Sequence, residues 1–358
     1  MVFGDEYAGK ADDYGTAEKN SIKDNGEKIK MKSRYWQKVR GICILAVILI
    51  HCPAGESGSS LYIWMISRHI INFAVAMFIF MSGYFVNPEK VKKGKYIGGR
   101  IQRLLIPFLI WDSFYAIKNI LLNHEYSTKR FIVEFVTGKT AAPLYYILVL
   151  IQLTILTPYI VKMRYENRGK WLYMVTPVYL LILYGYIITT GKQPFLYETV
   201  FPAWLSFYLL GIDLKRGVWD KLISKVRISW VGGALGISLI ESFLLMKIGT
   251  PIGFLSSQIR FGNFVYAFIF IAWIKKRECD VPDDVLNKVG DCSFGMYFIH
   301  LFVLQVVQKI ICLLGLNQIW ILYWGCCFFL TTIISYYCVN ITRKVISDKN
   351  VLKLVGFD

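Results

Sequence analysis

The sequence predicts an all-α membrane protein with about ten transmembrane helices and both termini in the cytoplasm, and three observations support this fold class. First, 55% of the 358 residues are hydrophobic and 18% are charged, whereas a soluble domain usually carries about 25% charged residues. Second, the apolar residues form runs of about 20 residues, the length that crosses a hydrocarbon core. Third, basic residues gather between alternate runs, as they do in cytoplasmic loops.

Three regions follow from the composition along the chain. Residues 1–33 are polar and contain no apolar run long enough for a signal peptide, so we expect a disordered cytosolic tail. Residues 34–345 form the membrane domain, and residues 346–358 form a short cytosolic end. Met31 directly precedes the first membrane-flanking charges, so the sequence leaves open whether the protein starts at Met1 or at Met31.

Apolar runs separated by charged or turn-forming residues define the transmembrane segments of the membrane domain. The predicted spans are 39–55, 62–86, 104–123, 142–161, 171–190, 199–214, 229–248, 256–274, 289–313 and 319–341. An even number of spans places both termini on one side of the membrane. With that side inside, the cytoplasmic segments collect most of the 41 Lys and Arg residues.

The charge and the cysteines exclude several classes of protein. The formal net charge of +17 lies in cytosolic loops, and no soluble module remains to bind a duplex, so we expect no nucleic-acid partner. Anionic lipid or an anionic substrate fits this charge better. The eight cysteines form no CxxC pair, and we interpret them as small hydrophobic residues. We expect neither a metal site nor a permanently bound cofactor.

The first span contains the sharpest pair of ionisable residues, Arg40 and His51 in VRGICILAVILIHC. Eleven residues make about three helical turns, so both side chains point the same way, and His51 lies roughly 16 Å deeper than Arg40. A titratable imidazole near the midplane suits general-base chemistry. The alternative is that Arg40 only anchors the helix at the membrane surface and His51 is a packing residue, and the pair alone does not decide between them.

A second basic pair, Arg100 and Arg103, opens the third span. Residues three apart lie on neighbouring turns of one helix face, so their guanidinium groups can bind one phosphate together. Composition alone favours a lipid-headgroup anchor.

Charged groups in a hydrocarbon core cost about 2.5–3.5 kcal/mol on insertion scales and are functional candidates by default. Glu241 lies well inside the seventh span, and Arg260 in the eighth is a possible partner at similar depth. Structural pairing and a functional role both stay open. Arg68 and His69, near the outer end of the second span, could contact an extracytoplasmic substrate, but we expect them to snorkel to the interface.

Two further polar patterns lie on apolar helices. Ser82 and Gly83, in FIFMSGYF, are small residues at which helices approach closely or backbone lines a cavity, and close packing is the default. His300, in SFGMYFIH, follows Ser293 and Gly295 on a polar stripe, where a histidine is more often structural than catalytic.

Taken in order, several fragments resemble one membrane-enzyme family, acyltransferase 3, over residues 34–345. They are an Arg, ten residues and a His in the first span, FAVAMFIFMSGYF, RIQRLLIPFLIW, PLYYILVLIQLTILTPYI, FPAWLSFYLLGIDL and CSFGMYFIHLFVL. The resemblance implies a multi-pass protein of a bacterial plasma membrane. It also implies transfer of an acyl group, typically acetyl from cytosolic acetyl-CoA, to a hydroxyl of an envelope glycan or lipid-linked sugar.

The resemblance also assigns roles to residues. Arg40 and His51 match the family's essential Arg-x10-His, and Arg100 and Arg103 match its RxxR motif, which is implicated in handling the CoA donor. We therefore expect the three arginines to bind the phosphates of the acyl-CoA co-substrate. His51 is expected to act as a general base or as a transient acyl carrier.

The remaining candidates are weaker. Ser82 and Gly83 match the start of the family's SGxL-type motif, although Tyr84 and Phe85 then depart from it. With Glu241, Arg260 and His300 they are candidates for substrate binding. The acceptor, the acyl chain (acetyl, succinyl or another) and the oligomeric state stay open.

Many family members carry an appended SGNH hydrolase-like domain that delivers the acyl group outside. This sequence ends at Asp358 with no room for one, so we expect transfer within the membrane domain or a separate extracytoplasmic transferase partner.

The alternative function is that of a transporter or exporter of a small polar solute. Glu241, Arg260 and His51 would then form a relay for protons or substrate. Binding or hydrolysis of acetyl-CoA distinguishes the two functions.

Overall fold

The computed structural model describes residues 34–55, 58–122 and 127–358, and every regular element within these ranges is a helix. The predicted all-α fold class is therefore confirmed. The predicted cytosolic tail, residues 1–33, lies outside the described residues. The first helix covers residues 34–51 in the described part of the chain.

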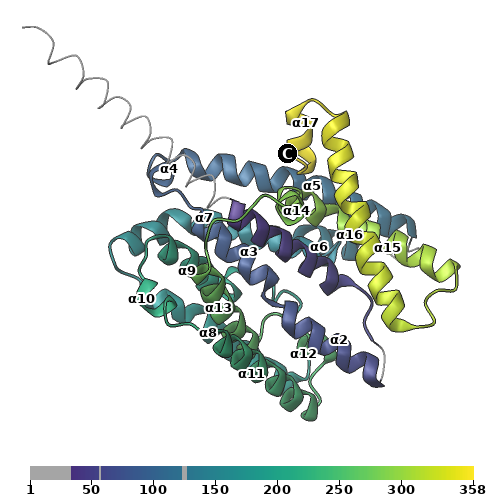
Figure 1. The fold of residues 1–358 in the computed structure, drawn as a ribbon, viewed down its shortest axis with the longest axis horizontal. Coiled ribbons are helices and arrows are strands. Elements are labelled where there is room, and N and C mark those ends of the chain that lie inside the picture. The colour runs from purple at the N-terminus through teal and green to yellow at the C-terminus, as the bar shows by residue number, and fades with distance from the viewer. Residues whose placement is uncertain (1–33, 56–57, 123–126) are drawn as a thin grey trace, which may run out of the picture.

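The helices after residue 51 divide into longer and shorter elements, labelled as in Figure 1. The longer helices are α2 (Gly58–Ile71), α3 (Phe73–Tyr84), α5 (Lys95–Leu122), α6 (Thr128–Thr137), α7 (Tyr145–Tyr165), α8 (Val175–Thr190), α9 (Leu205–Lys215), α11 (Ile228–Lys247), α13 (Phe261–Lys276), α15 (Ser293–Leu313) and α16 (Trp320–Val345). The short ones are α4 (Pro88–Lys92), α10 (Asp220–Ile223), α12 (Ile252–Leu255), α14 (Val285–Asp291), α17 (Lys349–Val355) and the 3₁₀ helices η1 (Ala142–Leu144), η2 (Lys170–Met174) and η3 (Phe201–Ala203).

Seven helical stretches of the described chain are long and apolar enough to cross a membrane. They are Gly58–Tyr84, Tyr96–Leu122, Ala142–Tyr165, Lys170–Thr190, Ile228–Lys247, Ser293–Leu313 and Trp320–Val345. The other predicted spans coincide with the first helix, with α9 of 11 residues and with α13 of 16 residues. Since α9 and α13 are shorter than the length that spans a bilayer, the count of ten and the side of the termini stay predictions.

The predicted span 62–86 is interrupted at Asn72, which separates α2 from α3. The Asn72 side-chain amide donates to the carbonyl of Ser256 at 3.2 Å. The Tyr266 hydroxyl donates to the carbonyl of Ile70 at 2.7 Å. The Tyr266 hydroxyl thus satisfies a backbone carbonyl next to the break, as a membrane interior requires, and the Asn72 side chain does the same for the backbone of Ser256.

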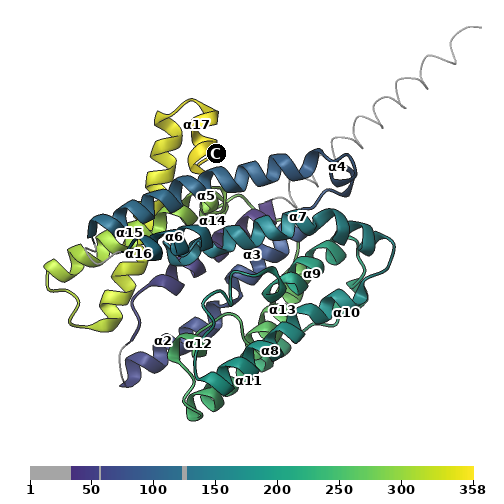
Figure 2. The same cartoon turned by 180° about the vertical axis from the view of Figure 1, so that it is seen from behind.

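The helices form two groups with the first helix, α3 and α7 between them (Figures 1 and 2). On one side lie α5, α14, α15 and α16, with the C-terminal α17 packed against α5. On the other side lie α8, α9, α11 and α13. This arrangement brings segments from opposite ends of the chain to the middle of the molecule.

Close packing of α3 against α9 explains why residue 83 is a glycine. A Cβ on Gly83 would lie 2.2 Å from the carbonyl oxygen of Tyr208, and one on Gly211 would lie 2.2 Å from the carbonyl oxygen of Phe80. Both positions therefore exclude a side chain. The predicted close approach at Gly83 is confirmed, and this glycine serves the packing of the helix that carries Ser82.

Candidate active site

A cavity of about 970 Å³ lies between the first helix, α3, α5, α7 and the α14–α15 segment. Four of its lining residues are Arg40, Arg100, Arg103 and Arg343. The structure therefore brings the three predicted donor-binding arginines to one cavity. Arg343 was missed, because its place at the end of the last span made it one of the ordinary membrane-flanking charges.

Arg40 and Arg100 keep hydrogen-bond donors for a ligand. Arg40 donates to the side-chain oxygen of Gln37 at 3.0 Å and lies over the ring of Phe85. Arg100 donates to the Tyr96 hydroxyl and to the carbonyl of Ser82. A guanidinium has five N–H groups, so each of these arginines retains several that could bind phosphate oxygens.

The C-terminal residues supply a carboxylate to the same cavity. The Asp358 carboxylate accepts a hydrogen bond from Arg103 at 2.5 Å. Arg343 donates to the carbonyl oxygens of Phe357 at 2.6 Å and Asp358 at 2.7 Å. Arg103 thus binds a carboxylate oxygen and Arg343 binds main-chain oxygens of the same segment, and a phosphate presents oxygens of the same kind.

Further in, the cavity is lined by Ser82, Tyr146 and Tyr297. The rings of Tyr146 and Tyr297 lie 5.5 Å apart, and the ring of Tyr297 lies 6.2 Å from that of His300. The two tyrosines therefore connect the arginine-lined cavity with the histidines. Tyr297 precedes His300 by three residues on one helix face, so the spacing in SFGMYFIH indicates that Tyr297 lies beside His300.

His51 and His300 form a pair inside the bundle, with ring centroids 5.4 Å apart. His51 is half-buried and makes no hydrogen bond to the described residues. The prediction that its ring points inward rather than to lipid is confirmed by this contact with a fully buried histidine. His51 itself is not among the residues that line the cavity, which reaches as far as Tyr297.

His300 uses only half of its hydrogen-bonding capacity. Its Nδ1 lies 2.8 Å from the carbonyl of Tyr297 and 3.1 Å from that of Met296. Since a carbonyl only accepts, Nδ1 carries the proton, and Nε2 of the neutral ring is an acceptor. Nε2 is buried and has no partner among the described residues, which sets His300 apart from a fully satisfied structural histidine.

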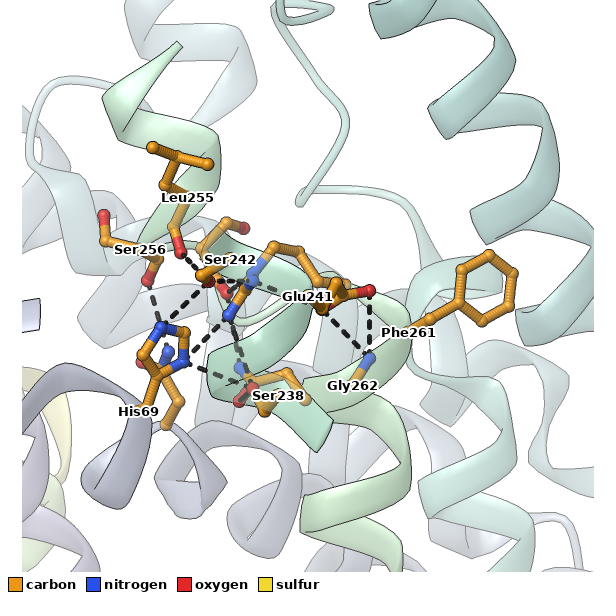
Figure 3. Close-up of polar contacts among 12 residues, drawn as sticks. His69, Ser238, Glu241, Ser242, Leu255, Ser256, Phe261 and Gly262 are labelled. Atoms are coloured by element: carbon orange, nitrogen blue, oxygen red, sulfur yellow. Dashed lines mark hydrogen bonds and ion pairs between the residues drawn. The ribbon is translucent and has the colours of Figure 1, made fainter. Parts of the chain in front are cut away.

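The predicted partner of Glu241 is confirmed in a separate network (Figure 3). Arg260 Nη1 lies 3.2 Å from the Glu241 carboxylate. Arg260 Nη2 donates to His69 Nδ1 at 2.9 Å, and His69 Nε2 bonds to the Ser242 hydroxyl at 2.9 Å. The prediction that His69 snorkels is wrong, because only 1% of its surface is exposed and Ser238 and Ser242 of α11 face it one turn apart.

This network ties four helices together. The Glu241 carboxylate also accepts hydrogen bonds from the Tyr184 hydroxyl at 2.6 Å and from the Gly262 backbone at 3.1 Å. The network therefore joins α2, α8, α11 and α13. It includes no contact to His51 in the described chain, so the structure does not bring Glu241, Arg260 and His51 together as one relay.

Comparison with known proteins decides the family. The model of a family described as "Acyltransferase domain" matches residues 34–340, which include the two histidines, most of the described helices and all the cavity-lining residues except Arg343 and Asp358. The chain belongs to the acyltransferase 3 family. It is therefore a membrane acyltransferase, as the ordered motifs predict.

The curated relatives are bacterial. The chain is similar to the "Probable poly-beta-1,6-N-acetyl-D-glucosamine export protein" of Staphylococcus aureus strain Mu50, with 24% identity over 78% of this chain and 83% of that protein. It is 26% identical to the protein of the same name in strain MRSA252, over 52% of this chain and 56% of that one. No solved structure matches the chain.

Proposed function

We propose that this acyltransferase moves an acyl group, typically acetyl, from cytosolic acyl-CoA to a hydroxyl of a cell-envelope glycan. The observation that carries the proposal is the continuity of the site. A cavity with four arginines reaches Tyr297, whose ring adjoins the His51–His300 pair. This arrangement supports an anionic donor held at one end and proton transfer at the other.

The arginines would bind the phosphates of CoA in the place where Asp358 now contacts Arg103. The pantetheine arm is long enough to run inward along the first helix, on the face that Arg40 and His51 share. Tyr146 and Tyr297 would flank this arm. Binding of the remote phosphates would thus place the thioester near His51 in a fixed orientation. Such positioning lowers the entropic cost of the reaction.

The chemical step then needs one base. His51 removes the proton from the acceptor hydroxyl, whose oxygen attacks the thioester carbonyl carbon. The new C–O bond forms, the C–S bond breaks, and the proton held by His51 passes to the departing thiolate. Each proton and electron pair is accounted for without another reactant. If His51 instead carried the acyl group, the hydroxyl would attack an acyl-imidazole.

The names of the curated relatives support a glycan as the acceptor class, because the relatives are named for a polymer of N-acetylglucosamine. Their names also favour export as a second function. Export without acyl transfer would leave the arginine-lined cavity without an evident ligand. The two functions differ in one measurement, because an acyltransferase should bind and slowly hydrolyse acetyl-CoA in detergent.

The test is the His51→Ala variant, purified and supplied with acetyl-CoA and a β-1,6-linked N-acetylglucosamine oligosaccharide. We expect kcat to fall by about 10²-fold or more, while the KM for acetyl-CoA and the melting temperature stay unchanged. Arg103→Ala should instead raise the KM for acetyl-CoA. Wild-type transfer rates in His51→Ala would contradict the proposed role of His51.

A further inference from the structure

Arg68, the residue next to His69, is a cation that neither the donor cavity nor the network of Figure 3 uses. It was expected to snorkel, but its Nη1 donates to the carbonyl of Ile50 at 2.5 Å and its Nη2 donates to the carbonyl of Ser256 at 3.2 Å. Both contacts point into the protein, so the expectation is wrong. Ile50 immediately precedes His51, which places Arg68 beside the proposed base.

Arg68 has unused hydrogen-bonding capacity. Of its five N–H groups, two are bonded to carbonyls of the described chain, and its buried Nε has no partner there. No carboxylate of the described residues lies within ion-pair distance of it, whereas Arg260 is paired with Glu241 at 3.2 Å. An inward-facing guanidinium that lacks a counter-ion marks a place for a polar ligand.

Hydrogen bonds link Glu198 to the surroundings of Arg68. The hydroxyl of Tyr197, the residue before Glu198, bonds to Ser257, and Arg68 donates to the carbonyl of the adjacent Ser256. The Glu198 side chain is 28% exposed, and its closest cation, Lys139, lies 3.8 Å away, too far for a hydrogen bond. Its carboxylate accepts no hydrogen bond from the described residues. Burial raises the pKa of Glu198, against the opposing effect of Lys139 and Arg68.

Two tyrosines complete this group. The ring of Tyr145, at the start of α7, lies 6.4 Å from that of Trp204, whose indole N–H donates to the backbone carbonyl of Glu198 at 2.9 Å. The Tyr145 hydroxyl has no hydrogen bond to the described chain. The Tyr197 hydroxyl bonds to Ser257 at 3.3 Å. Lys139 and Glu198 lie in connections predicted to be extracytoplasmic, on the far side of His51 from the arginine-lined cavity. The group therefore faces the side from which an envelope acceptor would arrive.

We propose that Arg68, Tyr145 and Glu198 form an acceptor subsite that binds the hydroxyl groups of a carbohydrate beside His51. The proposal rests on the proposed function, which it deepens by placing the acceptor. Vicinal hydroxyls both donate and accept hydrogen bonds. The subsite matches them with a carboxylate that accepts, a guanidinium that donates and a phenol that does both. Trp64, whose ring lies 5.7 Å below Arg68, adds the aromatic surface that sugar rings pack against.

The subsite is tested with Glu198→Gln and Arg68→Gln, using a β-1,6-linked N-acetylglucosamine oligosaccharide as the acceptor. We expect the KM for the oligosaccharide to rise about tenfold or more, because hydrogen bonds to charged groups are lost. Hydrolysis of acetyl-CoA in the absence of oligosaccharide should change less than about twofold, since water needs no subsite. Glu166→Gln, which alters an exposed carboxylate of a cytosolic connection, is the matched control.

Tyr145→Phe, which removes a single oxygen, keeps the proposal testable if either charge variant fails to fold. An unchanged oligosaccharide KM in the folded variants would overturn the subsite, and so would an equal loss of acetyl-CoA hydrolysis. Failure of the proposed function is a different result, because wild-type protein would then not consume acetyl-CoA. In that case, the change in Trp fluorescence on addition of the oligosaccharide still measures binding at the subsite. Equal affinities of the wild-type and Glu198→Gln proteins for the oligosaccharide would overturn the subsite.

Discussion

At the scale of single residues, His300 shows how backbone contacts fix the chemistry of a side chain. Its Nδ1 proton is held by the carbonyls of Tyr297 and Met296, so its Nε2 offers only a lone pair. Because the rings of His51 and His300 lie 5.4 Å apart, we propose that one His51 nitrogen donates to that lone pair during the reaction. The other His51 nitrogen would then be the base, as in triads in which a third group orients a histidine.

This reasoning predicts that His300→Phe lowers kcat by about tenfold or more and leaves the KM for acetyl-CoA unchanged, because His300 positions the base without binding the donor. The measurement is steady-state acyl transfer by the purified variant. Tyr173→Phe is the control, since it keeps the ring and removes only a hydroxyl that donates to Asp213, at a residue that does not line the cavity. Equal effects on kcat and on donor KM would show that His300 acts on binding instead.

Some residue contacts could be predicted from the sequence and others could not. The inward direction of His51 was expected from the sequence, and the pairing of Glu241 with Arg260 followed from the cost of isolated charges in a membrane. The His51–His300 contact joins residues 249 positions apart in sequence, and no spacing rule relates them. Arg68 was misjudged because the carbonyls of Ile50 and Ser256, which bind its guanidinium, come from other segments that the apolar pattern of the second span does not reveal.

At the scale of helices, a buried ion pair connects α7 to α9. Arg164 donates to the Asp213 carboxylate at 3.0 Å and 2.5 Å, and Asp213 is fully buried. The Tyr173 hydroxyl donates to the same carboxylate at 2.9 Å. Because α9 has only 11 residues, this pair helps to hold it in the bundle, next to the α3 segment that carries Ser82.

We therefore predict that Asp213→Asn destabilises the protein by about 3 kcal/mol or more, since it leaves Arg164 buried without its counter-charge. Thermal unfolding in detergent measures the change. Asp220→Asn, at an exposed position after α9, should leave the melting temperature unchanged. An unaltered melting temperature for Asp213→Asn would mean that water or another acceptor compensates Arg164.

The helices themselves were predictable to different degrees. Seven predicted spans coincide with stretches that are long and apolar enough to cross the membrane, because a run of about 20 apolar residues has few other stable placements. Hydropathy gave no sign of the break at Asn72 or of the shortness of α13, whereas the predicted span 199–214, which contains most of α9, was already short. The break depends on hydrogen bonds with distant segments, because the Tyr266 hydroxyl donates to the carbonyl of Ile70 and the Asn72 side chain donates to the carbonyl of Ser256.

At the scale of the whole molecule, the proposed donor and acceptor regions contact different parts of the first helix, because Arg40 lines the donor cavity and Arg68 bonds to the carbonyl of Ile50. The arginine-lined cavity meets the C-terminal α17 at Asp358. The Arg68–Glu198 group lies among connections predicted to be extracytoplasmic. The central claim is therefore that one chain joins a donor from one side of the membrane to an acceptor on the other, with His51 between them.

Sealed vesicles containing the protein test this claim most directly. The oligosaccharide is enclosed, and acetyl-CoA labelled in its acetyl group is added outside. The account predicts that label accumulates on the enclosed oligosaccharide with wild-type protein and does not do so with His51→Ala. Transfer only when both substrates are on the same side of the membrane would contradict it.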